Sequence, residues 1–303
     1  IVRSHAVVDA SGNADLAAAG GADTVEISAD HIGVQGTGLS PVDPGAEGPN
    51  TDYTFVDDAD VMDTTRAFAL ARERFQEHFD VAQMVDSRQR RQIRGDLCLD
   101  PVDFLAERTF PDTVVTARSN FDSHGFTVHP LFMAKSPDKE SLDAHIPIRC
   151  LLPAGVEGIL VTGLGVSAHR DALPVIRMQP DVQNQGYAAG RAAAMAAERH
   201  CGIRDIDVKA LQKHLVQVRI LEPDVLTHTD SFPIPPEKVT WAVREGMDSY
   251  LGLAIVFSQP ERSLPLLREA YHAETNTGRK VQRARVLGLM GDATGARTLI
   301  EQL

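Results

Sequence analysis

The residues from 148 to 200 place a short apolar run, a glycine turn and a long helix in succession, and this order constrains the fold more than any other feature. The run from Gly158 to Thr162 has an apolar centre of Ile, Leu and Val, which is typical of a buried strand. Gly163-Leu-Gly165 predicts a turn, and the Ala-rich residues 184–200 predict a helix. A strand, a turn and a helix in this order indicate an α/β fold.

The N-terminal part shows the same alternation. Residues 6–9 and 24–27 predict strands on either side of a short Ala-rich helix over 14–19. Residues 31–50, rich in Gly and Pro, predict an irregular connection. A helix is predicted over 64–79, because Phe68, Ala71, Phe75 and Phe79 recur at spacings of three and four and so share one face.

Beyond residue 203 the sequence predicts helices only. They come in short pairs with Leu and Ala on the inner face and tight turns between them, a pattern that resembles HEAT repeats. Such an array needs about three repeats or a supporting domain, so we expect this tail either to rest on the rest of the chain or to be cut short. The predicted helices cover residues 207–215, 236–247, 249–257, 262–271, 280–290 and 294–303.

Charge and hydropathy limit the partners. The net charge of −12 argues against nucleic acid, which is bound through clustered Lys and Arg, and favours a small-molecule ligand. The composition is that of a soluble globular protein, and no apolar run approaches the ~18 residues that a membrane span requires. The chain starts at Ile1, just before a predicted strand, so we expect an upstream part to be missing; a signal peptide would lie there, and the compartment stays open, cytoplasmic by default.

The three cysteines suggest no chemistry. Cys98, Cys150 and Cys201 are odd in number, far apart in sequence and form no CxxC pair, so neither a disulfide framework nor a zinc site is indicated. We expect all three to be small buried thiols. Metal ligands are not predicted anywhere in the chain.

The start of the long helix is the most informative place for a ligand. Between the turn and this helix, residues 170–185 predict an exposed polar stretch, and the helix is expected to open at Gly186 with almost no side chains as far as Gly190. The first N–H groups of a helix and the positive end of its dipole suit an electron-accepting or anionic group, such as the pyrimidine edge of a flavin. The alternative is that Gly and Ala only permit tight helix packing.

Four segments, in order along the chain, resemble the FAD-dependent oxidoreductase family. The longest runs from Pro147-Ile-Arg149 through Gly163, Val166-Ser-Ala168 and Ile176-Arg177 to Gln185-Gly-Tyr-Ala-Ala-Gly190. Asp207-Val-Lys-Ala-Leu-Gln212 is similar to its continuation. Val8-Asp-Ala-Ser-Gly-Asn-Ala-Asp-Leu-Ala17 is similar to the family's DATGDxDLA turn, and the Arg-rich residues 86–96 to a segment of the family that ends in GD.

This resemblance implies FAD as cofactor and an α/β fold in two parts. A discontinuous, partial FAD/NAD(P)-binding Rossmann-like domain would comprise residues 1–30 and 148–218, and an inserted α+β substrate domain residues 31–147. The all-α, HEAT-like tail predicted from the helical pairs would comprise residues 235–303. The matching positions that would contact the cofactor are Ala10, Ser11, Gly12, Gly163, Val166, Ser167, Arg177, Gln185, Gly186, Ala189 and Gly190.

Two departures from the family pattern weaken the expected FAD site. The N-terminal GxGxxG fingerprint is absent from the sequence, which removes the phosphate-binding turn expected for the adenosine half of FAD. Leu164 also stands where family members often carry Arg after the glycine. This chain alone is therefore not assured of binding flavin.

Several polar side chains are candidates for catalysis. His169 and Arg170 follow the turn, where a guanidinium would bind a substrate carboxylate or stabilise a reduced flavin; the alternative is a surface ion pair with Asp171. His124 and His129 are candidate bases for a substrate proton, and with Asp122 they have a metal-like spacing, but ordinary turn residues explain them as well. Two roles are open for the arginines of the Arg-rich segment, Arg88, Arg90 and Arg91. They contact the substrate or the flavin phosphate, or they form a solvated basic face.

We therefore predict a flavoenzyme that oxidises a small organic substrate by hydride transfer to FAD. The competing hypothesis is a non-catalytic binding or scaffold protein whose helical tail docks a protein partner. A hydrolase is disfavoured, since the sequence contains neither a GxSxG elbow nor an HExxH helix.

Overall fold

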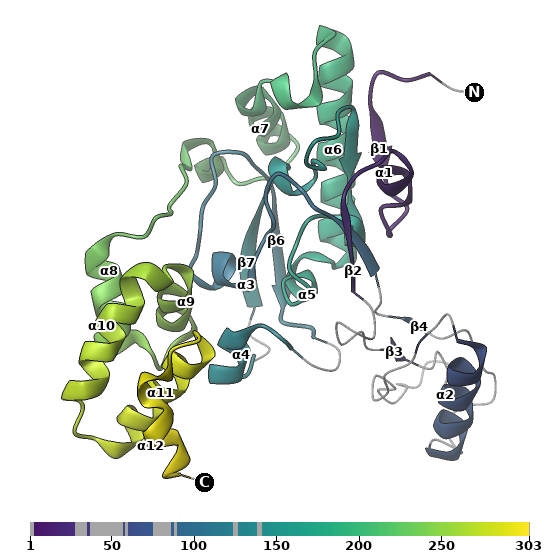
Figure 1. The fold of residues 1–303 in the computed structure, drawn as a ribbon. Helices are drawn as coiled ribbons and strands as arrows, with labels where there is room; N and C mark the ends of the chain where they lie inside the picture. Colours follow the sequence, from purple (N-terminus) through teal and green to yellow (C-terminus); the bar gives the residue numbers. More distant parts are fainter. Residues whose placement is uncertain are drawn as a thin grey trace.

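The structure is a computed structural model that describes residues 3–27, 35–36, 57, 60–74, 86–87, 90–123, 127–137 and 141–302. A central body of strands and helices carries a helical tail on one side and the α2 region on the other (Figure 1). Within the described residues the strands form four two-stranded pairings rather than one wide sheet.

The centre of the body is an antiparallel pair. Strand β6 (Thr113–Asn120) pairs with β7 (Ser141–Pro147), and β6 is buried along most of its length because helices cover it. Helices α5 (Leu173–Ile176), α6 (Gln179–Arg199) and α7 (Val208–Gln217) pack against β6.

A short parallel pair lies beside this centre. Strand β1 (Val7–Asp9) pairs with β8 (Ile159–Val161) in the register Asp9 opposite Val161. The chain turns after β1 into α1 (Asp15–Ala19), and after β8 into a 3-10 turn (Gly163–Gly165). Because parallel strands end at the same edge, both turns leave the pair on the same side. The strands predicted at 6–9 and 158–162 are confirmed.

Two further pairings contain the residues before and after the α2 region. Strand β2 (Thr24–Ile27) is antiparallel to β5 (Arg90–Ile93), and β3 (Gln35–Gly36) to β4 (Asp86–Ser87). Helix α2 (Val61–Arg74) begins three residues earlier than predicted. On its predicted face Phe68 is half-buried and Ala71 is buried, while Phe75 and Phe79 lie outside the described residues. Most of the connection predicted over 31–50 also lies outside them.

The start of α6 differs from the prediction in a way that moves the expected site. The helix begins at Gln179, with Pro180 in its first turn, where the missing N–H and fixed φ of proline suit a helix start. Gly186 and Gly190 therefore lie within the helix rather than at its opening. The exposure predicted for residues 170–185 is wrong for the first part of the stretch, since Asp171 and all of α5 are buried against the body, whereas Gln179, Pro180 and Gln183 are exposed.

The C-terminal helices pack directly on the body. Helix α9 contacts α3 (Pro101–Leu105), and α11 contacts α4 (Pro130–Ala134), where Arg285 donates to the Met133 carbonyl. A single apolar core runs from Ile27 in the body to Leu287 in the tail. The resemblance of these C-terminal helices to HEAT repeats stays a prediction. The tail comprises α8 (Pro236–Trp241), a π-helical turn (Ala242–Gly246), α9 (Tyr250–Ser258), α10 (Pro260–Ala273), α11 (Thr277–Leu289) and α12 (Ala296–Ile300).

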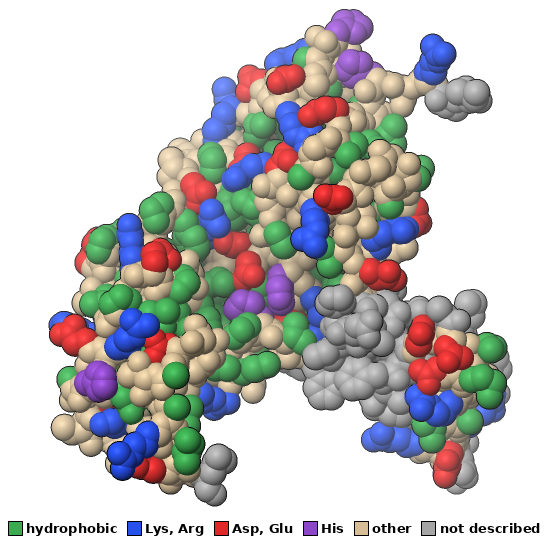
Figure 2. All heavy atoms as spheres, viewed as in Figure 1, with side chains coloured by type: hydrophobic (Ala, Val, Ile, Leu, Met, Phe, Trp, Pro, Cys, Tyr) green, Lys and Arg blue, Asp and Glu red, His purple; other side chains and the backbone are tan. Residues whose placement is uncertain are grey.

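Two surface properties complete the description. Acidic and basic side chains are interspersed over the face shown in Figure 2. Of the helices that the structure describes, none combines the length and the apolar character needed to cross a bilayer.

Candidate functional site

The turn after β1 is organised by a buried carboxylate. Asp9 has no exposed surface, and its Oδ1 accepts from the Ser11 amide at 3.0 Å and the Ser11 hydroxyl at 2.7 Å, while Oδ2 accepts from the Ala17 amide at 2.9 Å. Burial raises the pKa of Asp9, but these hydrogen bonds outweigh it and hold the pKa below its ordinary value. Gly12 follows with φ of 76°, a conformation that favours glycine.

The turn after β8 is tied to α6 by one side chain. Gln185 has no exposed surface; its Oε1 accepts from the Gly163 amide at 3.0 Å, and its Nε2 donates to the Ile176 carbonyl at 3.0 Å. Gly163 has φ of 72°. The amide of Gln185 therefore fixes the position of the glycine turn relative to the start of α6.

These two turns and the start of α6 surround a cavity of about 630 Å³. No side chain caps the N-terminus of α6, so its first N–H groups are available to a ligand. Arg177 adds a guanidinium that donates to the Asp122 carbonyl at 3.0 Å. The lining residues are Ala10, Gly12, Asp122, Thr162, Gly163, Leu164, Arg177, Met178, Gln179, Val182 and Gln183.

The predicted cofactor residues divide into three groups by position. Ala10, Gly12, Gly163 and Arg177 line this cavity. Ser11 and Gln185 shape the turns through the hydrogen bonds above. The remaining positions lie elsewhere: Gly186 and Gly190 are two and three turns into α6, Ala189 is buried in its packing face, Val166 is buried, and Ser167 lines a second cavity.

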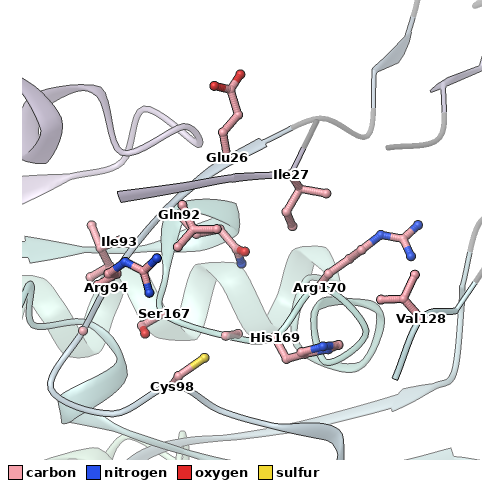
Figure 3. Close-up of a pocket in the computed structure, with 13 residues that line it drawn as sticks. Glu26, Ile27, Gln92, Ile93, Arg94, Cys98, Val128, Ser167, His169 and Arg170 are labelled. Carbon is pink, nitrogen blue, oxygen red and sulfur yellow. The ribbon is translucent and has the colours of Figure 1, made fainter. Parts of the chain in front are cut away.

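The second cavity, of about 560 Å³, lies between the β2–β5 pair and residues 167–170 (Figure 3). Its walls are mainly apolar, and Cys98, Ser167, His169 and Arg170 contribute polar groups. Cys98 was predicted to be buried and this was wrong, because the segment between β5 and α3 forms the cavity wall. Cys150 is buried as predicted, and Cys201 is half-buried.

Two histidines meet beside this cavity. His169 and His129 pack edge to face, with ring centroids 5.3 Å apart. The Nδ1 of His169 accepts from the Asp171 amide at 3.0 Å, and the Nδ1 of His129 accepts from the Leu131 amide at 3.2 Å. Because Nδ1 is an acceptor in each ring, the proton of each neutral imidazole lies on Nε2.

Two carboxylates hold the histidines in place. The Nε2 of His129 lies 3.4 Å from Oδ1 of Asp100, the residue that caps α3. Oδ2 of the buried Asp171 accepts from the amides of Val128 and His129, both at 2.7 Å, and its Oδ1 lies 3.4 Å from Arg170. Both ring nitrogens of His129 are therefore engaged, an arrangement that does not favour its predicted role as a base.

Burial controls the electrostatics of this cluster. It lowers the pKa of His169, which favours the neutral imidazole, and it also lowers the pKa of the Arg170 guanidinium. At Asp100 burial raises the pKa, but hydrogen bonds from His129 and the Val102 amide outweigh it and leave the pKa below its ordinary value. Desolvation by the cavity wall raises the pKa of the Cys98 thiol.

Of the other candidates, the structure describes the side chain of Arg91 alone. His124 and Arg88 lie outside the described residues, as does the side chain of Arg90. Arg91 donates through Nε to the Asn13 carbonyl at 3.1 Å and pairs with Asp15, so it braces the turn between β1 and α1. Among the described residues, no group of three or more His, Cys, Asp or Glu side chains is arranged to hold a metal ion.

Comparison with known proteins identifies the family. A family model described as FAD dependent oxidoreductase matches residues 60–215, just over half of the chain. The chain belongs to the FAD dependent oxidoreductase family. No curated protein and no solved structure matches it significantly. The matched residues include the Arg-rich segment and the long run up to Gly190, whereas the similarity of residues 8–17 to the DATGDxDLA turn stays a prediction.

Sequence reasoning missed two residues that organise these sites. Asp9 belongs to the segment that resembles the DATGDxDLA turn. Its place at the end of a strand, just before a glycine turn, was the available signal. Asp100 precedes Pro101 with Asp103 three residues later, a capping pattern that marks a helix start. Its proximity to His129 depends on tertiary packing and has no local signal.

Proposed function

We propose that the cavity at the start of α6 binds the flavin of FAD, with the pyrimidine edge at the helix N-terminus. The observation that carries this proposal is the meeting of two positive-φ glycine turns, an uncapped helix start and the Arg177 guanidinium around one space of about 630 Å³. The backbone N–H groups and the cation suit an electron-rich, oxygen-bearing ring edge. The residues present therefore fit the group that the family implies.

When bound, a flavin supplies the acceptor for two electrons and a hydrogen, which leave a substrate carbon as hydride. Arg177 is held by the Asp122 carbonyl and keeps its positive charge where negative charge develops on the ring edge. Asp9 and Gln185 act as positioning residues, since Asp9 fixes the turn after β1 and Gln185 fixes the turn after β8 through their hydrogen bonds.

The second cavity is proposed as the place of the substrate. His169 presents Nε2–H, because Nδ1 already accepts from the backbone, and so acts as a hydrogen-bond donor to a substrate oxygen rather than as a base. Arg170 lies beside it as a cation. This arrangement orients an oxygen-bearing organic molecule. The reaction proposed is its oxidation, in which a hydride would leave a substrate carbon for the flavin and the proton that the substrate also loses would pass to solvent water.

Flavin binding tests the proposal directly. Protein expressed from the entire reading frame is titrated with FAD, and the absorbance band near ~450 nm and quenching of flavin fluorescence are followed. Arg177→Gln should weaken binding by about tenfold to 150-fold, since a charge-assisted contact contributes about 1.5 to 3 kcal/mol. The matched control is Arg118→Gln, which removes an exposed guanidinium paired with Asp143.

Two results would refute the proposal. A folded protein that keeps no flavin absorbance after unbound FAD is removed, and that does not quench flavin fluorescence, would exclude the flavin site and favour the scaffold hypothesis. Equal loss of binding in both arginine variants would show that Arg177 has no special role at the ring.

A further inference from the structure

We propose that the second cavity selects an elongated organic dianion with an apolar body, such as a linear dicarboxylate, with one carboxylate at Arg94 and the other at Arg170. The assignment of this ligand as the substrate rests on the function proposed above. The binding itself is a property of the cavity and is tested without flavin.

The body of the ligand is defined by the walls. Ile27 and Ile93, from the paired strands β2 and β5, are 5% and 2% exposed, and Ala168 on the opposite side is 6% exposed. Val25 and Val128 extend the same apolar lining. Such walls stabilise a hydrocarbon chain by removing its surface from water, whereas a compact polar molecule gains little from them.

One anionic end is set by Arg170. Its side chain is 14% exposed and pairs with Asp171 at 3.4 Å, so a ligand carboxylate would share this guanidinium with Asp171; His169 lies beside it, and its Nε2–H adds a neutral donor. In this partly desolvated place the attraction between a guanidinium and a carboxylate is stronger than in water. Arginine also matches the planar carboxylate with two parallel hydrogen bonds.

The other end is set by Arg94, at the far side of the cavity from Arg170 (Figure 3). Arg94 lines the same cavity as Cys98. Its backbone is fixed by two hydrogen bonds of 2.9 Å, to the Asp23 carbonyl and from the Ala154 amide. The two cations thus come from separate, rigid parts of the chain.

The charge of the lining favours an anion over a cation. Of the described residues that line the cavity, Glu26 alone is acidic, against two arginines. Figure 3 shows the Glu26 carboxylate directed away from the space between Arg94 and Arg170. A monoanion would satisfy one end only, which is why two carboxylates are expected.

Cys98 supplies a probe that needs no enzyme activity. Its thiol lines the cavity, so a bound ligand should shield it from iodoacetamide, while the half-buried Cys201 serves as an internal reference in the same digest. Alkylation rates are measured by peptide mass spectrometry at a pH near ~8.5, where thiolate is present. The probes are glutarate, suberate and sebacate, with octanoate and 1,8-octanediol as controls of charge.

We expect at least one dicarboxylate to slow Cys98 alkylation about tenfold at saturation without changing Cys201, and the diol to have no effect. Arg94→Gln and Arg170→Gln should each reduce the protection to that given by octanoate. Arg94→Gln is the safer variant for folding, because this residue is exposed. Arg118→Gln is again the control.

Three outcomes would overturn the inference: no protection by any dicarboxylate, equal protection by octanoate, or equal protection in the arginine variants. A protein that binds FAD but shows one of these results keeps the proposed flavin site and loses this substrate class. Protection of Cys98 in a protein that does not bind FAD would keep the dianion-binding cavity and exclude the proposed flavin site.

Discussion

Replacing Gln185 with leucine should be among the most damaging single changes in the body. Leucine is similar in size and apolar, but it leaves the Gly163 amide and the Ile176 carbonyl without their hydrogen bonds. Each orphaned buried group costs about 1 to 3 kcal/mol, so the free energy of unfolding should fall by about 2 to 6 kcal/mol. Flavin affinity should fall as well, because the glycine turn loses its anchor.

Urea denaturation followed by circular dichroism measures the first effect. With a slope of about 3 kcal/mol per molar urea, the midpoint should move down by about 1 M. The matched control is Gln183→Leu, which changes an exposed glutamine two residues earlier on the same helix and should move the midpoint little. A Gln185→Leu variant as stable as the control would refute the reasoning.

Gln185→Glu separates the two hydrogen bonds. A carboxyl oxygen still accepts from the Gly163 amide, but only a protonated carboxyl donates to the Ile176 carbonyl. Burial raises the folded-state pKa of such a carboxyl above its unfolded value near ~4.3, so stability is present at low pH and is lost as pH rises through the folded pKa. The variant should therefore be more stable at pH 5 than at pH 8, relative to the parent protein.

Two further predictions concern Asp9 and the two histidines. Asp9→Asn should lower the free energy of unfolding by about 2 to 3 kcal/mol, because the amide presents a donor where the carboxylate accepts three hydrogen bonds. Folding lowers the pKa of Asp9, so its contribution to stability is complete above about pH 4 and is lost as pH falls through the folded pKa; thermal denaturation from pH 2.5 to 7 should show this acid sensitivity in the parent but not in the variant. Nitrogen-15 NMR of the imidazoles at pH 7.5 should find His129 and His169 protonated on Nε2, with His169 gaining its second proton below the ordinary pH near ~6.5; a proton on Nδ1 of His169 would contradict the proposed donor role.

The sequence predicted those parts of the fold whose signal is local. Local patterns predicted strands β1, β2 and β8 and the helices of the tail, because each element is an apolar run or a periodic apolar pattern whose ends are marked by turn residues. The start of α6 was placed late because residues 179–183 look like a polar loop, and the proline at position 180 was not taken as a first-turn residue. Exposure of residues 170–178 was wrong for a different reason, since Asp171 is polar in sequence but satisfied by two backbone amides.

The candidate site was predictable only where it coincides with the two glycine turns. Ala10, Gly12, Gly163 and Arg177 were selected from the family resemblance, and the parallel pairing of β1 with β8 brings the turns together. Cys98 was set aside because free cysteines are usually buried. Its place in the second cavity depends on the packing of residues 94–99 against residues 167–169, which no local pattern encodes.

The corrected start of α6 also changes what the glycines of this helix can do. A Cβ at Gly186 or at Gly190 would meet nothing within 4 Å, so neither glycine is required by packing inside the described structure. At Gly12 and Gly163 the requirement is different, because a positive φ strains any other residue there. If the cavity of α6 holds the flavin as proposed, Gly12→Ala and Gly163→Ala disturb the turns themselves, whereas alanine within α6 favours the helix by about 1 kcal/mol per position. In the function proposed above, the helix start and the two turns are the part of this chain expected to contact the cofactor, and open space at Gly186 and Gly190 is equally consistent with a ligand or with solvent.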